Sequence, residues 1–137
     1  MNLGKMIEVF CNNQDGHIIN IEKENNALNI YVQIKYLARN FGEKYDIMKY
    51  KIINFKKIEL NVLAKKYEKI DEINNITLDI INAEVGKDHS LLINILANGT
   101  SLGKLYIWSD KENDIKIYDQ ENNEIEYSTF DNYNRRK

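Results

Sequence analysis

Alternation of apolar and polar residues between Ala27 and Leu37 is the feature that most constrains how this chain folds. In the stretch "ALNIYVQIKYL", one face collects Leu28, Ile30, Val32, Ile34 and Tyr36, and the other collects Asn29, Tyr31, Gln33 and Lys35. Because successive side chains of a strand point to opposite faces, this pattern is typical of a strand with one buried face. The sequence therefore predicts a sheet that packs against a core on one side.

Two shorter β-rich runs precede this strand. They are "MIEVF" (6–10) and "HIINIE" (17–22), and they flank the segment "CNNQDG". Asp15 and Gly16 in that segment tolerate the positive backbone angles of a tight turn. We expect an N-terminal hairpin here, and a further strand in "KYDIMKYKIIN", from Lys44 to Asn54.

The spacing of apolar residues changes after Lys57. Leu60, Leu63, Ala64, Tyr67 and Ile70 recur at intervals of three and four residues. Residues with this spacing lie on one stripe of a helix. The pattern predicts a single helix over about residues 57–72, which the pair Asn74-Asn75 closes because asparagine tolerates the left-handed conformation at a helix end.

The remainder of the chain has the pattern of consecutive antiparallel strands. The runs "ITLDIINAE", "LLINILA", "GKLYIW" and "DIKIYD" are separated by "VGKDHS", "NGTSL" and "SDKEN". Asn98-Gly99 is the strongest turn signal among them. The short run "EIEYS" predicts an additional edge strand.

Strands on both sides of one helix indicate an α+β fold. We expect a mostly antiparallel, strongly twisted sheet or half-barrel, with the helix (about residues 57–72) packed on a face. A β-sandwich with a helical insertion is the alternative. A chain of 137 residues fits one domain, which we place at residues 1–130, followed by a polar and flexible tail at 131–137.

Composition bears on the compartment and the source. No apolar run is long enough to span a membrane, and the N-terminus lacks the features of a signal peptide. Cys11 is the one cysteine and cannot form an intrachain disulfide, which fits a reducing compartment. We therefore expect a cytoplasmic protein. The abundance of Ile, Asn, Lys and Tyr, which have A+T-rich codons, indicates a bacterial or phage genome.

Motifs for catalysis or cofactor binding are missing from the sequence. It contains no GxSxG, HExxH or CxxC motif and no glycine-rich phosphate loop. His17 and His89 are the two histidines, and we interpret both as partly exposed polar residues rather than metal ligands. We expect neither a cofactor nor a metal ion.

The stretch "SDKENDIKIYD" has carboxylates at Asp110, Glu112 and Asp114, a spacing that an oxygen-ligand loop for a cation can show. A helix-flanked calcium loop requires glycine at its sixth position and glutamate at its twelfth, where Ile115 and Glu121 stand. The calcium motif therefore fails. We interpret the stretch as the turn of a hairpin between "KLYIW" and "IKIYD".

Charge is distributed unevenly along the chain. Residues 44–69 hold eight lysines against three acids, whereas residues 110–131 hold eight acids against two lysines. Aromatic residues interleave the acidic stretch, which favours a surface that binds a basic protein partner. The candidate partner-binding residues are Trp108, Asp110, Glu112, Asp114, Tyr118, Asp119, Glu121, Glu124 and Glu126. Nucleic-acid binding through the Lys44–Lys69 segment ranks lower, since arginine is scarce and the overall pI is 5.7.

These patterns together favour a small, non-enzymatic binding protein. We expect it to inhibit or neutralise a protein partner with a basic surface, as a bacterial toxin-immunity protein (an antitoxin) or a phage-encoded inhibitor of a host defence nuclease such as an anti-CRISPR. One alternative is an enzyme with a dispersed site around His17 and His89. The other is a structural or assembly subunit of a phage or secretion system.

Overall fold

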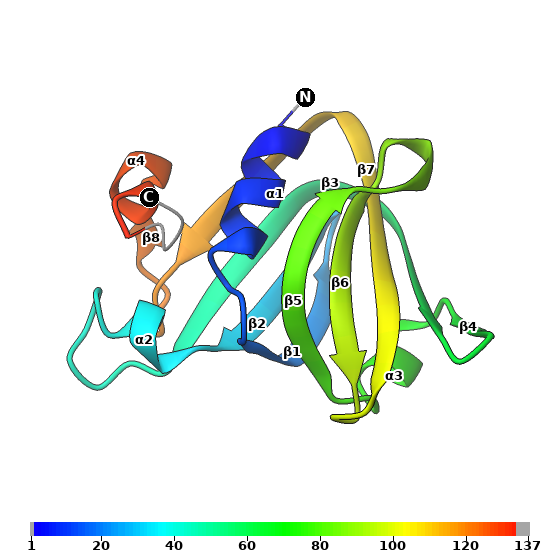
Figure 1. Cartoon of the computed structure of the whole chain (residues 1–137). Coiled ribbons are helices and arrows are strands. Elements are labelled where there is room, and N and C mark those ends of the chain that lie inside the picture. Colours follow the sequence, from blue (N-terminus) through cyan, green and yellow to red (C-terminus); the bar gives the residue numbers. More distant parts are fainter. Residues whose placement is uncertain (1, 134–137) are drawn as a thin grey trace.

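Within residues 2–133, the part of the chain that the computed structural model describes, eight strands form one antiparallel sheet (Figure 1). The strands are β1 (His17–Glu24), β2 (Ala27–Gln33), β3 (Ile47–Val62), β4 (Lys65–Tyr67), β5 (Leu78–Val85), β6 (Leu91–Ala97), β7 (Ser101–Tyr118) and β8 (Glu124–Ile125). The helices are α1 (Leu3–Cys11), α2 (Lys35–Ala38), α3 (Ile70–Ile73) and α4 (Tyr127–Asp131), with a 3₁₀ turn, η1, at Lys87–His89. The predicted class, an antiparallel twisted sheet with helices, is confirmed.

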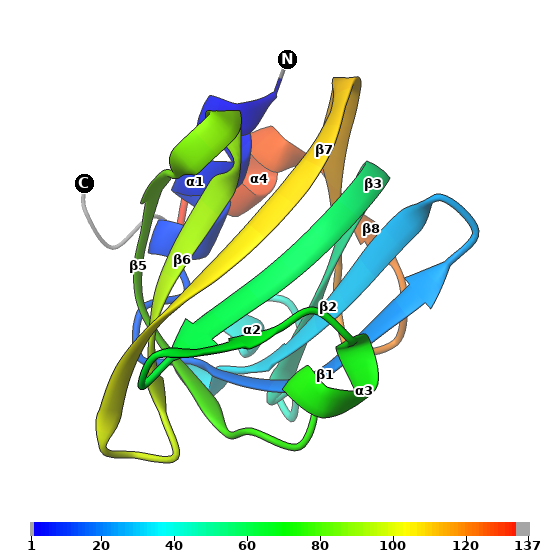
Figure 2. The same cartoon turned by 90° about the vertical axis from the view of Figure 1, so that its right-hand side faces the viewer.

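The strand ladders form a closed circuit. β1 pairs with β2, β2 with β3, β3 with β7, β7 with β6, β6 with β5, and β5 returns to β1. β3 lies between β2 and β7, as Figure 2 shows, and its ladder with β7 is the longest. The joint between β5 and β1 has two residue pairs, His17 with Asp79 and Ile18 with Leu78. The strands thus form one continuous sheet and not two stacked sheets, so the alternative β-sandwich is wrong.

The core lies inside this circuit and is closed by helices. β2 points Leu28, Ile30 and Val32 into it, fully buried, as the alternation predicted. The predicted strand is too long, however, because β2 ends at Gln33 and Tyr36 lies exposed in α2. Tyr50 of β3 is also fully buried, and its hydroxyl donates a hydrogen bond of 2.7 Å to Asn13 Oδ1. The Tyr50 ring packs edge-on against Phe130 of α4, with centroids 6.0 Å apart. Residues from both ends of the chain therefore complete one core.

The predicted N-terminal hairpin is wrong, because "MIEVF" is part of helix α1. Met6, Val9 and Phe10 follow the three-and-four spacing of a helix, and all three are buried. The run is rich in β-formers, but this stripe covers the core beside β5, and packing outweighs weak strand propensity. Asp15 does adopt a positive φ of 72°, so the predicted turn exists, but it connects a helix to β1.

The predicted helix over residues 57–72 is also wrong. β3 continues to Val62, a two-residue turn leads to β4, and α3 is a single short turn. Ile58, Leu60 and Val62 alternate, and each is buried in the core, so a period of two runs through the same segment. The helical stripe was a coincidence of spacing, and Leu63, one of its members, is 76% exposed.

The predicted turn at "SDKEN" is wrong as well. β7 runs without reversal from Ser101 to Tyr118, and both of its halves pair with the long strand β3. A reversal would have turned the second half away from β3. The meander of β5, β6 and β7 is confirmed, as is the turn at Asn98-Gly99, where both residues have positive φ. The predicted edge in "EIEYS" is confirmed as the two-residue strand β8.

The end of the described chain departs from the predicted domain boundary. Asp131 belongs to helix α4, so the boundary between residues 130 and 131 falls inside a helix. Residues 134–137 of the predicted tail lie outside the described residues. Among the residues that are described, none of the helices has the length and apolar composition needed to cross a membrane.

Candidate functional site

A four-residue bulge interrupts the ladder between β3 and β7. Phe55 pairs with Ser109 and Ile53 pairs with Asp114, so that residues 110–113 of β7 stand opposite the single residue Asn54. Asn54 has a positive φ of 59°, which bends β3 at this point. We call residues 110–113 the β7 bulge. Bulges redirect side chains away from the regular alternation of a strand, and this one contains the first two carboxylates of the predicted site.

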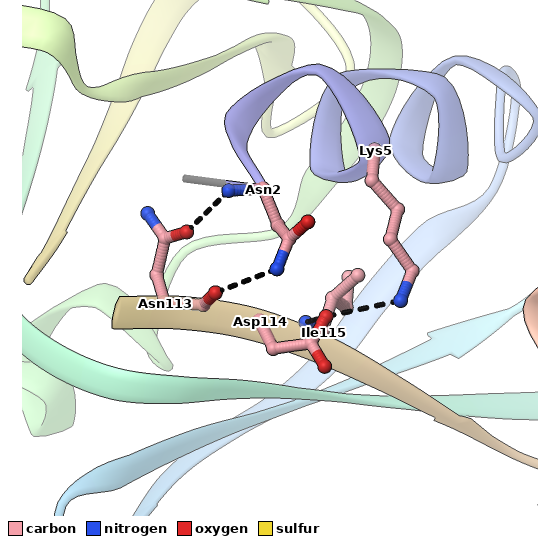
Figure 3. A network of polar contacts seen from close by, with 5 residues as sticks. All are labelled: Asn2, Lys5, Asn113, Asp114 and Ile115. Atoms are coloured by element: carbon pink, nitrogen blue, oxygen red, sulfur yellow. Dashed lines mark hydrogen bonds and ion pairs between the residues drawn. The ribbon is translucent and has the colours of Figure 1, made fainter. Parts of the chain in front are cut away.

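Helix α1 holds the β7 bulge in place at its N-terminus (Figure 3). The backbone N–H of Asn2 donates to Asn113 Oδ1 at 2.6 Å, and Asn2 Nδ2 donates to the Asn113 carbonyl at 2.8 Å. Asn113 Nδ2 in turn donates to Ser109 Oγ at 3.0 Å. Asn113 is 5% exposed, so these bonds satisfy polar atoms that water does not reach. Segments more than one hundred residues apart in sequence thereby fix the bulge.

Asp114 strengthens the same junction. Its Oδ1 accepts from Lys5 Nζ at 3.0 Å and from the backbone N–H of Ile115 at 2.8 Å (Figure 3). Partial burial raises the pKa of Asp114, but the bonds from Lys5 and Ile115 outweigh this effect and hold the pKa below its ordinary 3.8. Asp114 therefore anchors α1, and its charge is already neutralised within the chain.

The outer part of the β7 bulge is open to solvent. Asp110, Lys111 and Glu112 are all exposed. Asp110 pairs with Lys56 at 3.0 Å, and the Glu112 carbonyl accepts from Asn54 Nδ2 at 2.6 Å. These residues line a shallow hollow of about 580 Å³. The bulge thus exposes side chains of both charges, and the hydrogen bonds between Asn113 and Asn2 fix its backbone.

Trp108 lies on β7 directly before this region and is half-buried. The ammonium group of Lys57 is 4.6 Å from the centre of the Trp108 ring, and that of Lys87 is 5.9 Å from it. The Tyr106 ring stacks beside Trp108 with centroids 5.7 Å apart. Both lysines are thus in the range of favourable cation–π contact. Trp108 is the one candidate anchor next to the bulge.

A buried carboxylate holds Lys87, one of these two lysines. Glu59 is 2% exposed and accepts from Lys87 Nζ at 2.7 Å and from Asn61 Nδ2 at 3.0 Å, with Lys66 at 3.4 Å. Burial raises the pKa of Glu59, but the hydrogen bonds and the two lysine charges outweigh it, so the pKa lies below its ordinary 4.5. Glu59 positions Lys87 over the aromatic pair. The sequence does not indicate this role of Glu59, because a lone glutamate among lysines carries no signal of burial.

The other predicted site residues lie at and after the C-terminal end of β7. Asp119 follows Asp114 by five positions, about 16 Å along a strand. The Asp119 carboxylate is buried and accepts from the backbone N–H groups of Glu121 and Asn123, both at 2.9 Å, so it closes the turn to β8. Glu121 accepts from the Tyr45 hydroxyl at 2.5 Å and raises the pKa of Tyr45 to about 12.

The remaining members of this second set are less constrained. Tyr118 is half-buried beneath the Lys49 ammonium group, which is 5.1 Å from the ring centre. Glu124 and Glu126 are exposed and form no ion pair within residues 2–133. The nine predicted residues therefore form two separate groups. Several carboxylates, Asp114 and Asp119 above all, serve the fold itself.

The two histidines do not meet. His17 Nδ1 hydrogen-bonds to Asp79 Oδ1 where β5 begins, while His89 follows the opposite end of β5 in the turn η1. The eight residues of β5 span about 25 Å. A site that uses both histidines is therefore not formed. No group of three His, Cys, Asp or Glu side chains suited to a metal ion occurs among the described residues.

A second surface feature escaped the sequence analysis because it depends on the wrongly predicted helix. Leu63 and Ala64 form the two-residue turn between β3 and β4, with φ of 51° and 63°, the pattern of a type I′ turn. The left-handed conformation costs a residue with a side chain about 1–2 kcal/mol. Leu63 and Leu102 are 76% and 74% exposed and flank a hollow of about 470 Å³. We call it the leucine hollow.

Comparison with known proteins adds no functional information. The chain matches no family model, no curated protein and no solved structure. Its function has to be inferred from its own surface.

Proposed function

We propose that this protein is a non-enzymatic binding protein that inhibits a protein partner, and that its contact surface is the β7 bulge together with Trp108. The observation that carries this proposal is that Asn2 and Asn113 already hold the bulge in place before any partner binds. A contact loop whose backbone is already ordered loses less conformational entropy on binding, so more of the contact energy appears as affinity.

Within the β7 bulge, Asp110 and Glu112 are the groups that can meet a basic partner, and Lys111 stands between them. Asp110 and Glu112 both face solvent, and the pair between Asp110 and Lys56 is exposed on both sides. An exposed pair of this kind contributes about 0–1 kcal/mol to stability. An arginine or lysine of the partner can therefore replace Lys56 at little cost. Trp108 supplies the aromatic contact area that commonly anchors such interfaces.

A bacterial toxin or a host defence nuclease fits this description of the partner. A surface that binds nucleic-acid phosphates is rich in Lys and Arg, so an acidic loop can compete for it. The expected cytoplasmic compartment agrees with Cys11, which is buried and donates to the Ala83 carbonyl at 3.3 Å. A protein of this type acts by occupying its partner and requires no catalytic residue.

The test compares charge reversal in the β7 bulge with charge reversal at and after β8. The wild-type chain, the variant Asp110→Lys with Glu112→Lys, and the control variant Glu124→Lys with Glu126→Lys are immobilised and exposed to a lysate of the cells that encode the protein. All four positions are exposed and the change in net charge is the same, so the variants differ in location alone. The captured protein is then purified and its activity titrated with each variant.

We expect wild type and the control variant to capture one stoichiometric protein and abolish its activity at a one-to-one ratio, while the bulge variant loses both properties. Equal loss in both charge-reversal variants would mean that general acidity, and not the bulge, attracts the partner. Stable self-association of wild type without a captured protein would favour the assembly-subunit alternative instead.

A further inference from the structure

A second docking surface lies at the other end of β7, and it is independent of the β7 bulge. We propose that the leucine hollow binds a protein segment that carries an apolar side chain next to carboxylates. Leu63, Ala64, Ile81 and Leu102 supply its apolar walls, and Lys104 lies inside it. Exposed apolar side chains gathered around a hollow are typical of interaction surfaces. Asp110 follows Leu102 by eight positions, about 26 Å along a strand.

The backbone conformation of Leu63 in the hollow is unfavourable in free energy. Leu63 and Ala64 occupy the two positions of a type I′ turn, where Asn and Gly are the favoured residues. The chain uses the favoured pair Asn98-Gly99 at the neighbouring turn between β6 and β7. A strained leucine whose side chain faces solvent gains nothing for the isolated fold. Strain of this kind is commonly held at sites of contact.

The floor of the hollow is backbone of the sheet. Gly103 lies on β7 between Val62 of β3 and Ile95 of β6. A Cβ at this position would lie 2.7 Å from Val62 Cγ2 and 2.8 Å from Ile95 Cδ1, two side chains buried in the core. Gly103 therefore faces the core, and it contributes only backbone to the hollow. Leu63 and Ala64, which form one wall, lie in the turn between β3 and β4.

The charge of the hollow determines which occupant it favours. No acidic residue lines it, and Lys104 forms no ion pair with any residue in 2–133. Lys65 and Lys66 follow directly after Ala64 and are exposed. A lysine beside apolar walls is complementary to a carboxylate beside an apolar side chain. A second copy that docked through its own leucine hollow would bring like charges together, and a flat lipid surface would leave the recess unfilled.

The experiment uses the synthetic peptide Glu-Glu-Leu-Phe-Leu-Glu-Glu as the probe and the sequence Lys-Lys-Leu-Phe-Leu-Lys-Lys as its opposite-charge control. Each is titrated to about 1 mM into the full chain while backbone amide shifts are recorded by NMR. The variant Leu63→Asn with Ala64→Gly removes the leucine and keeps the turn, because Asn-Gly is favoured there. The variant Lys104→Gln removes the charge, and Lys116→Gln is its control on the same strand.

We expect the acidic peptide to shift amides around Leu63, Asn94 and Lys104, and the basic peptide to leave them unchanged. The turn variant and Lys104→Gln should each weaken binding about tenfold or more, whereas Lys116→Gln should have no effect. The melting temperature of the turn variant should be equal to or above that of wild type. The absence of shifts, or equal shifts with both peptides, would overturn the proposal. So would dimerisation of wild type, or binding to phosphatidylserine vesicles, that the turn variant abolishes. The turn variant should still capture any partner of the β7 bulge, so the two proposals fail separately.

Discussion

Identical residue types have different roles in this protein according to what surrounds them. Glu59 is buried and paired with Lys87, whereas Glu112, also on the β3–β7 pair, faces solvent. Asp114 and Asp119 belong to the same acidic stretch as Asp110, yet they accept backbone hydrogen bonds and stabilise local structure. Glu59 and Asp114 also pair with the distant residues Lys87 and Lys5, which local sequence does not indicate, whereas the donors to Asp119 lie within four residues of it.

Lys87 should be more important for stability than its exposure implies. The variant Lys87→Met leaves the buried Glu59 carboxylate without its closest donor, and we expect the free energy of unfolding to fall by about 1–3 kcal/mol in urea denaturation. Lys66→Met is the control, since Lys66 is 3.4 Å from Glu59 and contacts it less closely. An equal effect of the two substitutions would contradict the role assigned to Lys87.

Glu59 should also contribute to acid unfolding. Its pKa in the folded protein lies below the ordinary 4.5, so the charged form stabilises the fold at pH values above 4.5. This contribution is lost as the pH falls from 4.5 through the folded-state pKa. We therefore expect Glu59→Gln to reduce the dependence of the melting temperature on pH in this acidic range, measured by differential scanning calorimetry. An unchanged slope would show that Glu59 is not linked to acid unfolding.

At the scale of elements, β3 and β7 organise the molecule. They are the longest strands, and they pair with each other along most of their length on both sides of the β7 bulge. The bulge allows two regular stretches of β7 to keep their inward side chains, among them Ile107 and Ile115, despite the four extra residues between them. Asn2 at the start of helix α1 hydrogen-bonds to Asn113, so the helix and the β7 bulge stabilise each other.

Asn113→Ala tests this coupling between α1 and the β7 bulge. It removes the side-chain bonds to Asn2 and Ser109 at a buried position, and we expect a loss of about 1–3 kcal/mol in the free energy of unfolding. Hydrogen exchange should accelerate in residues 109–114 and at the start of α1, and not around Asn98-Gly99. Acceleration spread evenly over the sheet would mean that the bulge is not a separate local unit.

At the scale of the whole molecule, the circuit of strands has one weak joint. The ladder between β1 and β5 has two residue pairs, whereas that between β3 and β7 has twelve. Beyond this joint, Asn74 replaces a strand partner: its side chain accepts from the Ile21 N–H and donates to the Ile21 carbonyl, both at 2.8 Å. Local opening of the circuit should therefore begin between β1 and β5.

A disulfide across this joint should stabilise the fold. His17→Cys and Asp79→Cys place thiols at directly paired positions of two antiparallel strands, in a background where Cys11→Ala removes the native thiol. We expect the oxidised form to gain about 2–4 kcal/mol over its own reduced form, measured by chemical denaturation. No gain on oxidation would indicate that the cross-link strains the native pairing of β1 and β5.

The sequence determined those elements whose signal is local. Alternation at Leu28, Ile30 and Val32 identified β2, and Asn98-Gly99 identified the turn between β6 and β7, because side-chain period and positive φ are properties of neighbouring residues. It also identified Trp108, Asp110 and Glu112 as residues of an exposed aromatic and acidic region. In the structure Trp108 is half-buried and the two acids are exposed, and their role in binding stays a prediction.

Tertiary structure decided the rest. Residues 57–62 fit both a helix and a strand, and pairing with β7 selected the strand. "SDKEN" fits a turn, but β7 continues along the long strand β3 and forms a bulge there. The N-terminal run is a helix because the apolar side of that helix packs on the core beside β5. Likewise, the leucine hollow exists only where β3, β6 and β7 meet. In each case the free energy that selected the outcome comes from contacts between residues far apart in sequence, which a pattern within one segment does not contain.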